Sequence, residues 1–335
     1  MTDFAPTESL LSSARTRAAR GEWGEMRQLV GATPAEGRGP ELTLLLAEAH
    51  LRTGQLAEAH ALIEPVVRLC AEAGNTWLHR RAVNMLGAAA FELGHMKESE
   101  QQFNEALALA NLAGDSLTLG RATNNLGMIC HIRGQYDRAL TQYQLAVPAY
   151  QRLGYTAGLA ETHHNMALAL RELEQLDLAD RNERRAIDYA RGAGNRRLLA
   201  IAHVGRAELL LRRGRAVVAV AGARLGAEEY AAIGDVVGEA DAWRVTGAAH
   251  LMQGEMIAAA QALDRAVDLA RQHGSALIEA EAHESRARLH ARMFNWPLVS
   301  ADVADARRLY QSIGAKSLDE ALFKWCMSVL PAEQH

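Results

Sequence analysis

A repeat of 40 residues is the feature that most constrains the fold of this 335-residue chain. Glycine returns at the same place in seven consecutive periods, without an insertion or deletion between them. These glycines are Gly74, Gly114, Gly154, Gly194, Gly234, Gly274 and Gly314. A second series contains only small residues, namely Ala47, Gly87, Gly127, Ala167, Ala207, Gly247 and Ala287. Such a repeat indicates small structural units that stack on one another.

Each period contains two helical blocks that are separated by a turn. In the first period we expect an amphipathic helix over about 41–53 and a longer helix over about 56–73. The turn between them carries a third series, namely Gly54, Gly94, Gly134, Glu174, Gly214, Gly254 and Phe294. Glycine ends helices because it adopts the left-handed conformation without a Cβ clash. The repeat therefore predicts pairs of helices joined by a turn, while the backbone geometry of the turn at Glu174 and Phe294, which lack the glycine, stays open.

The composition limits the class of protein. The chain is 49% hydrophobic and 23% charged, so it can form a core. Its net charge is −4, which gives no basic footprint for nucleic acid. Its three cysteines have no CxxC spacing and fit a reducing compartment. We find no signal peptide and no apolar stretch of membrane-spanning length, so we expect a cytoplasmic protein that binds neither membrane nor nucleic acid.

One segment resembles a known family. The stretch "NNLGMICHIRGQYDRALTQYQLAV" (124–147) resembles a tetratricopeptide repeat (TPR), with its "LG", "G-x-Y" and "AL…A" landmarks. The 40-residue spacing is similar to the arrays of LGN/Pins-type polarity adaptors and to the C-terminal arrays of bacterial maltose-activator-type regulators. The resemblance covers seven tandem repeats over 41–320. It implies an all-α fold, a right-handed α-solenoid of stacked helix-turn-helix units.

The two ends differ from the regular array. Residues 1–40 are expected to contain a degenerate helical pair over 7–31, turning at Gly21, and a linker over 31–40. Residues 317–335 are expected to form a capping helix, stopped by Pro331, and a tail. The helix would cover the last repeat's apolar face. An alternative role, as an exposed helix that binds a partner, stays open.

No catalytic signature is present. The sequence has no P-loop, no GxGxxG after a strand, no GxSxG and no HExxH, so we expect no enzyme, no catalytic residue and no cofactor. Histidines recur in phase at 163, 203 and 283, and at 50, 250 and 290. In-phase residues lie on successive helices about 10 Å apart, too far to share one metal ion. We therefore interpret them as packing or solvated histidines and expect no metal site.

The resemblance implies that the first helix of each repeat lines a concave groove. A stripe at three- and four-residue spacing along these helices would face a partner. The scaffold does not require asparagine in this stripe, because Leu44, Val204 and Val245 fill the corresponding places elsewhere. The candidate binding residues are Arg81, Asn84, Arg121, Asn124, Asn125, Met128, His131, His164, Asn165, Leu168, Arg171, Val204, Glu208, Leu211 and Arg244.

These residue types favour a protein-interaction adaptor that binds a peptide or a partner helix. Arginine binds carboxylates bidentately, and asparagine can bond to an extended main chain. We therefore expect a partner with an acidic or mixed segment and an apolar anchor near Val204 and Leu211. Two alternatives stay open. The asparagines could only bridge adjacent helices, or the chain could be a ligand- or peptide-sensing array, of bacterial origin by its composition, that acts in trans on a transcription factor or kinase.

Overall fold

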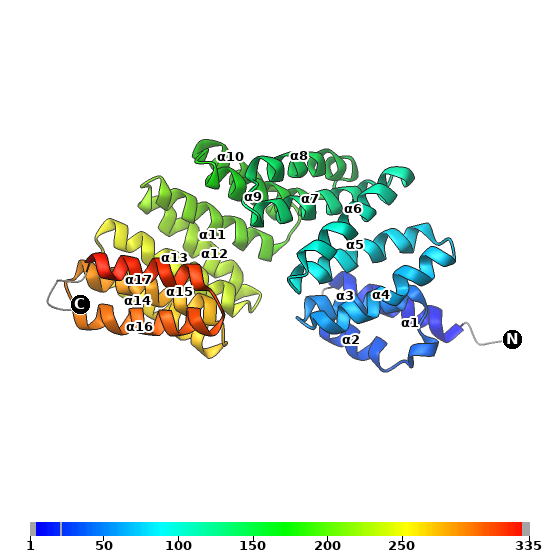
Figure 1. Ribbon diagram of the computed structural model, residues 1–335, viewed down its shortest axis with the longest axis horizontal. Helices are drawn as coiled ribbons and strands as arrows, with labels where there is room; N and C mark the ends of the chain where they lie inside the picture. Colours follow the sequence, from blue (N-terminus) through cyan, green and yellow to red (C-terminus); the bar gives the residue numbers. More distant parts are fainter. Residues whose placement is uncertain (1–4, 21, 330–335) are drawn as a thin grey trace. The chain divides into compact units, whose positions relative to one another are not determined.

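The computed structural model describes residues 5–20 and 22–329, and every regular element in that part of the chain is a helix (Figure 1). The elements are α1 (Ala5–Arg20), α2 (Trp23–Gly31), the 3₁₀ helix η1 (Ala35–Gly37), α3 (Pro40–Arg52), α4 (Leu56–Glu72), α5 (Thr76–Glu92), α6 (Met96–Ala113), α7 (Ser116–Ile132), α8 (Tyr136–Leu153), α9 (Thr156–Glu172), α10 (Leu176–Gly192), α11 (Arg196–Arg212), α12 (Ala216–Ala232), α13 (Val236–Gln253), α14 (Met256–Gln272), α15 (Ala276–Arg292), α16 (Trp296–Ser312) and α17 (Lys316–Val329). The prediction of an all-α fold is confirmed.

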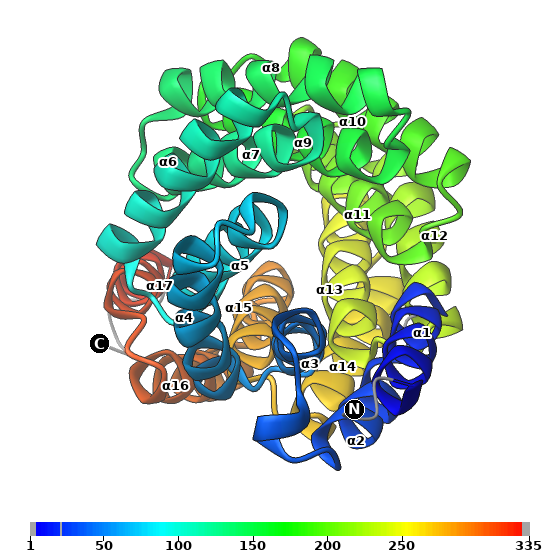
Figure 2. The same ribbon diagram turned by 90° about the vertical axis from the view of Figure 1, so that its right-hand side faces the viewer.

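The helices pack in two compact units, unit 1 up to Gly158 and unit 2 from Leu159. Within each unit a helix packs on the next one along the chain, as α7 does on α8 and α13 on α14. Odd-numbered helices also contact the next odd-numbered helix, α3 with α5 in unit 1 and α11 with α13 in unit 2. Figure 2 shows the result in unit 2, where α11, α13 and α15 form one layer and α12, α14 and α16 the other. This is the stacking of an α-solenoid.

The turns keep one geometry throughout the repeats. Gly154 has φ +61°, and the N–H of Tyr155 donates to the carbonyl of Tyr150 at 3.0 Å. Glu174 and Phe294 replace the turn glycine and have φ values of +57° and +56°. They keep the left-handed conformation because the hydrogen bond after it is retained, at 2.9 Å from the N–H after Glu174 and at 3.0 Å from the N–H after Phe294. The positions that the sequence left open therefore have the same turn.

A matched pair of residues, a small one and the residue that faces it, sets the distance between the two helices of a hairpin. Gly127 on α7 lies against the ring of Tyr143 on α8, and a Cβ at Gly127 would lie 2.4 Å from that ring. Gly87 lies in the same way against Phe103, and Gly247 against Leu263. The positions corresponding to Gly127 and Tyr143 hold Ala207 and Ala223 in another hairpin, and both are fully buried in one core cluster. The small residue of each pair thus allows close packing against its partner.

The two ends of the described chain are helical. In unit 1, α1 and α2 pack against α3, and Met26 and Val30 are buried with Leu42. In unit 2, α17 buries Leu322 and Cys326 against α15 and α16. The expected turn at Gly21 and stop at Pro331 lie outside the described residues. The division of the chain into a 1–40 segment, seven repeats over 41–320 and a 317–335 cap stays a prediction.

No helix in the described ranges has the length and apolar character needed to span a membrane.

The pair Gly127 and Tyr143 gives a test of the matched packing. We expect Gly127→Ala to lower the free energy of unfolding by up to about 2 kcal/mol, because overpacking costs about 1–3 kcal/mol and the gain in helix propensity offsets about 1 kcal/mol of it. Chemical denaturation measures the change. Adding Tyr143→Leu should recover part of the loss in a double-mutant cycle. Gly24→Ala in α2 is the control, since no atom lies within 4 Å of the added Cβ, and an equal loss there would contradict the explanation.

Candidate functional site

Four of the predicted binding residues come together in one pocket of unit 2. The pocket has a volume of about 230 Å³ and lies on the odd-numbered helices α9, α11 and α13. Its lining residues are Arg171, Glu208, Leu211, Arg212, Arg244, Val245 and Ala248. The candidates read from the sequence include Arg171, Glu208, Leu211 and Arg244, but not the other three lining residues. Ala248 lies one turn after Arg244 in the same stripe, and this spacing already places it on the face of the candidates.

The charged residues of the pocket form a ladder across successive odd-numbered helices. Glu208 on α11 accepts from Arg171 Nη1 on α9 at 3.0 Å and from Arg244 Nη2 on α13 at 2.9 Å. Arg244 also donates from Nε to Asp241 at 2.8 Å and lies 3.5 Å from Glu281 on α15. Glu208 and Arg244, in the centre of the ladder, thus each contact charged side chains on two neighbouring odd-numbered helices.

Glu208 and Arg244, in the centre of the ladder, stay ionised at neutral pH. Burial works to raise the pKa of Glu208, but Arg244 and Arg171 hold that pKa below its usual range. Burial also opposes the charge of Arg244, but Asp241, Glu208 and Glu281 outweigh it and keep the pKa of Arg244 above its ordinary value. A carboxylate that enters the pocket must therefore compete with Glu208 for the arginines, and the apolar residues beside them can supply the additional binding free energy.

A buried ion pair lies beside the ladder. His164 Nδ1 on α9 is 3.1 Å from Oε1 of Glu183, which is buried on α10. Burial opposes protonation of His164, but the Glu183 carboxylate prevails and raises the pKa of the imidazole above its ordinary value. The neighbouring His163 faces Asn182 instead, at 2.8 Å, and burial lowers its pKa. Two adjacent histidines therefore have opposite shifts in pKa.

The remaining candidates of unit 2 do not all reach a surface. Asn165 and Leu168 on α9 are half-buried. Val204 is only 5% exposed and packs in the core with Ala223 and Tyr230. The expectation that Val204 forms part of an apolar anchor beside Leu211 is therefore corrected, because the apolar residues that line the pocket with Leu211 are Val245 and Ala248.

The candidates of unit 1 are mostly enclosed by neighbouring helices. Asn84 and Asn124 are 8% and 2% exposed. Arg81 donates to Glu48 on the previous odd-numbered helix at 2.9 Å. Four further candidates are half-buried, namely Arg121, Asn125, Met128 and His131. The two buried asparagines therefore do not present an open surface.

A buried atom of Asn84 is one of several in unit 1 that depart from the usual rule that buried polar groups are paired. Asn84 Oδ1 is fully enclosed and has no hydrogen-bond partner among the described residues. Leaving such a group unpaired costs about 1–3 kcal/mol. The side chain of Asn84 thus has unused hydrogen-bonding capacity, as do those of Gln102 and Gln142 in the same unit.

The difference in pKa between His163 and His164 is measurable by NMR titration of the ring protons. We expect His164 to titrate above and His163 below the ordinary pKa of about 6.5. Since the folded pKa of His164 is raised, the stability that it contributes is complete below about pH 6.5 and is lost as pH rises through the folded pKa. Glu183→Gln should move the pKa of His164 below the ordinary value, because burial, its largest influence, then outweighs the smaller and opposing effects of Arg171 and Glu208. Coincident titration of both rings in the wild type would contradict this description.

Sequence comparison identifies repeats in the centre of the chain. The tetratricopeptide repeat family model matches residues 118–192, which run from α7 to α10. No curated protein sequence gives a significant match to the chain.

Solved structures with a similar fold cover most of the chain. One is a signal transduction ATPase with numerous domains from Pyrococcus horikoshii that carries a tetratricopeptide repeat sensor, with a TM-score of 0.69 and 11% identity. The match covers 89% of this chain and 46% of that protein, so the chain spans less than half of its length. A Rap protein complexed with competence and sporulation factor has a TM-score of 0.63 and 10% identity, with 96% of each chain covered.

A third similar structure is the APC/C hetero-tetramer Cut9–Hcn1. It has a TM-score of 0.64 and 12% identity, and the match covers 93% of this chain and 55% of that one. At such identities these structures support the fold alone. The family match identifies tetratricopeptide repeats over residues 118–192, and the stacked hairpins of both units have the fold of these structures.

Proposed function

We propose that this protein is a non-enzymatic interaction adaptor that binds a peptide or a partner helix on the odd-numbered helices of unit 2. The observation that carries the proposal is the pocket in which Arg171, Glu208 and Arg244 lie beside Leu211 and Ala248. A charged frame around apolar side chains resembles the arrangement of specific interfaces, where apolar anchors supply affinity and polar groups set orientation.

The chemistry of the pocket favours a partner with an acidic or mixed segment. Three arginines and one glutamate line it, so its own lining carries an excess of positive charge. Arg212 is the most exposed of the arginines, and its nearest carboxylates, on Glu172 and Glu174, are both 3.6 Å away. A partner carboxylate can approach Arg212 first, while an apolar side chain next to it contacts Leu211.

Similar folds in known complexes support a peptide or protein as the partner. The Rap structure is a complex with competence and sporulation factor, and Cut9 is in complex with Hcn1. The identities are 10% and 12%, so the analogy concerns the way in which the fold is used and not the identity of a partner.

A second candidate function is regulation by a signalling ligand, with an output on another protein. The likeness to the Rap complex, which covers 96% of both chains, and to the P. horikoshii protein with its repeat sensor favours this candidate. Both functions use the same pocket. They differ in what is bound, a large protein or a small peptide that changes the affinity for a second protein.

Affinity capture from the source organism tests the pocket. We expect Leu211→Glu and Arg212→Glu each to reduce recovery of the specific partner at least tenfold. Leu211→Glu places a charge where the partner's apolar side chain would be buried, and Arg212→Glu turns the positive charge that would attract a partner carboxylate into a negative one. Mass spectrometry of the bound material distinguishes a protein from a peptide. The melting temperature of each variant shows that the fold is retained.

Two matched substitutions on the even-numbered layer are the controls. Ile257→Glu on α14 changes an apolar residue that is 78% exposed, and Arg224→Glu on α12 reverses an exposed arginine. Both should capture the partner as the wild type does. If the pocket variants retain the partner as well as these controls, the pocket does not bind it and the proposal fails.

A further inference from the structure

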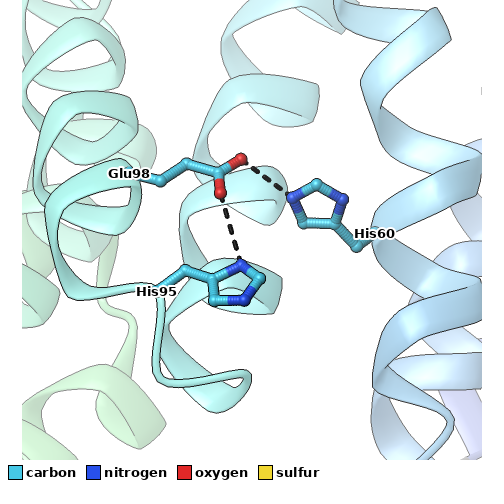
Figure 3. A group of neighbouring side chains, drawn as sticks. All are labelled: His60, His95 and Glu98. Carbon is cyan, nitrogen blue, oxygen red and sulfur yellow. Dashed lines mark hydrogen bonds and ion pairs between the residues drawn. The ribbon is translucent and has the colours of Figure 1, made fainter.

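Two histidines and a glutamate surround one point on the even-numbered helices of unit 1. Figure 3 shows the group, in which His60 on α4 and His95 just before α6 both point toward the carboxylate of Glu98 in the first turn of α6. One ligand atom from each of the three residues can be chosen so that all lie within 4.8 Å of one another. This group is remote in sequence from the pocket of unit 2 and has no part in the proposed function.

The spacing of these atoms is close to that of a metal site. His60 Nε2 lies 2.8 Å from Glu98 Oε1, and His95 Nδ1 lies 3.5 Å from Glu98 Oε2. The two rings meet edge to face, with their centroids 6.3 Å apart. Ligands of a tetrahedral ion at bond lengths of about 2.1 Å are separated by about 3.4 Å. Small rotations of the side chains therefore suffice to bring all three onto one ion.

The donor set selects a class of ion. Imidazole nitrogens suit zinc and its neighbours among the first-row transition metals, whereas magnesium and calcium prefer oxygen ligands alone. Two histidines and one glutamate also form a known set of three protein ligands for zinc, which leaves the fourth position to water. The carboxylate contributes one negative charge against the two of the ion.

The repeat does not account for these residues. The positions corresponding to His60 in later periods hold Glu100, Leu140 and Asp180, and those corresponding to Glu98 hold Glu58, Arg138 and Leu178. The position of His95 is most often glutamine, as at 55, 135 and 175. Glutamate is found singly at some of these places, but one junction between two even-numbered helices alone combines two histidines with a glutamate.

The group is also open to ions from solution. His60 and Glu98 are half-buried, and His95 is exposed. Partial burial orders the side chains, while the exposed ring of His95 leaves a path to the ligand atoms. A binding site on two different helices would link α4 to α6 through the ion and stabilise their packing.

We propose that His60, His95 and Glu98 form a binding site for one divalent transition-metal ion, with zinc as the ion that fits the donor set. The ion replaces the contacts of Glu98 with the two histidines and fastens α4 to α6.

Titration of the untagged, metal-free protein with Zn²⁺ tests the site. Isothermal calorimetry should give one equivalent of zinc at this site, and Co²⁺ should give the intense visible absorption of a four-coordinate ion with nitrogen ligands. We expect His60→Ala, His95→Ala and Glu98→Gln each to weaken zinc binding at least tenfold and to abolish the cobalt spectrum. Zinc should raise the melting temperature of the wild type but not of these variants.

His273→Ala is the matched control, since it removes an exposed histidine of unit 2 and should leave zinc affinity and the cobalt spectrum unchanged. Circular dichroism of the metal-free variants reports whether each retains the helical fold. Zinc affinity that is equal in the wild type and all three variants, or an absence of binding at submillimolar zinc, would overturn the proposal. The group would then be an ordinary hydrogen-bonded cluster. Neither result affects the partner pocket, whose variants are separate.

Discussion

The close contact between a small residue on one helix and a larger one on the next holds the hairpins in their arrangement. Gly127 against Tyr143 is among the closest of these contacts, since a single added carbon would overlap the ring. Because this contact fixes how closely two helices approach, it also fixes where the odd-numbered helices lie in their layer. The charge ladder of unit 2 depends on that spacing, since ion pairs within about 3 Å form only when the layer is closely packed.

The sequence predicted the fold well because the repeat carries the information several times over. The blocks at 41–53 and 56–73 correspond to α3 and α4 within one residue at each end. Glu174 and Phe294 show that the turn depends on its neighbours and not only on glycine. Packing of the two helices and the hydrogen bond that closes the turn hold these residues at positive φ, at a local cost of about 1–2 kcal/mol.

The site was predictable only in part, for a physical reason. Spacing along a helix indicates which residues share a face, and it brought Arg171, Glu208, Leu211 and Arg244 together. It does not indicate how much of that face the neighbouring helices cover, which is why Asn124 and Val204 were assigned to a surface although they are buried. Polar contacts between helices also join residues that are not at the same place in their repeats. The ladder joins residues 36 or 37 positions apart, and His60 and Glu98 are 38 apart, so a search at the period of 40 overlooks them.

The matched contacts also determine which pieces of this chain are interchangeable. An even-numbered helix that carries tyrosine at its contact position needs glycine on the facing helix. An even-numbered helix that carries alanine at this position would leave a void if it were packed against that glycine. A helix taken from one repeat therefore does not fit the partner helix of another repeat, although the repeats share the same turn. The hairpin, which contains both members of its pair, is the smallest part that can be moved within the array, duplicated or deleted with its internal packing intact.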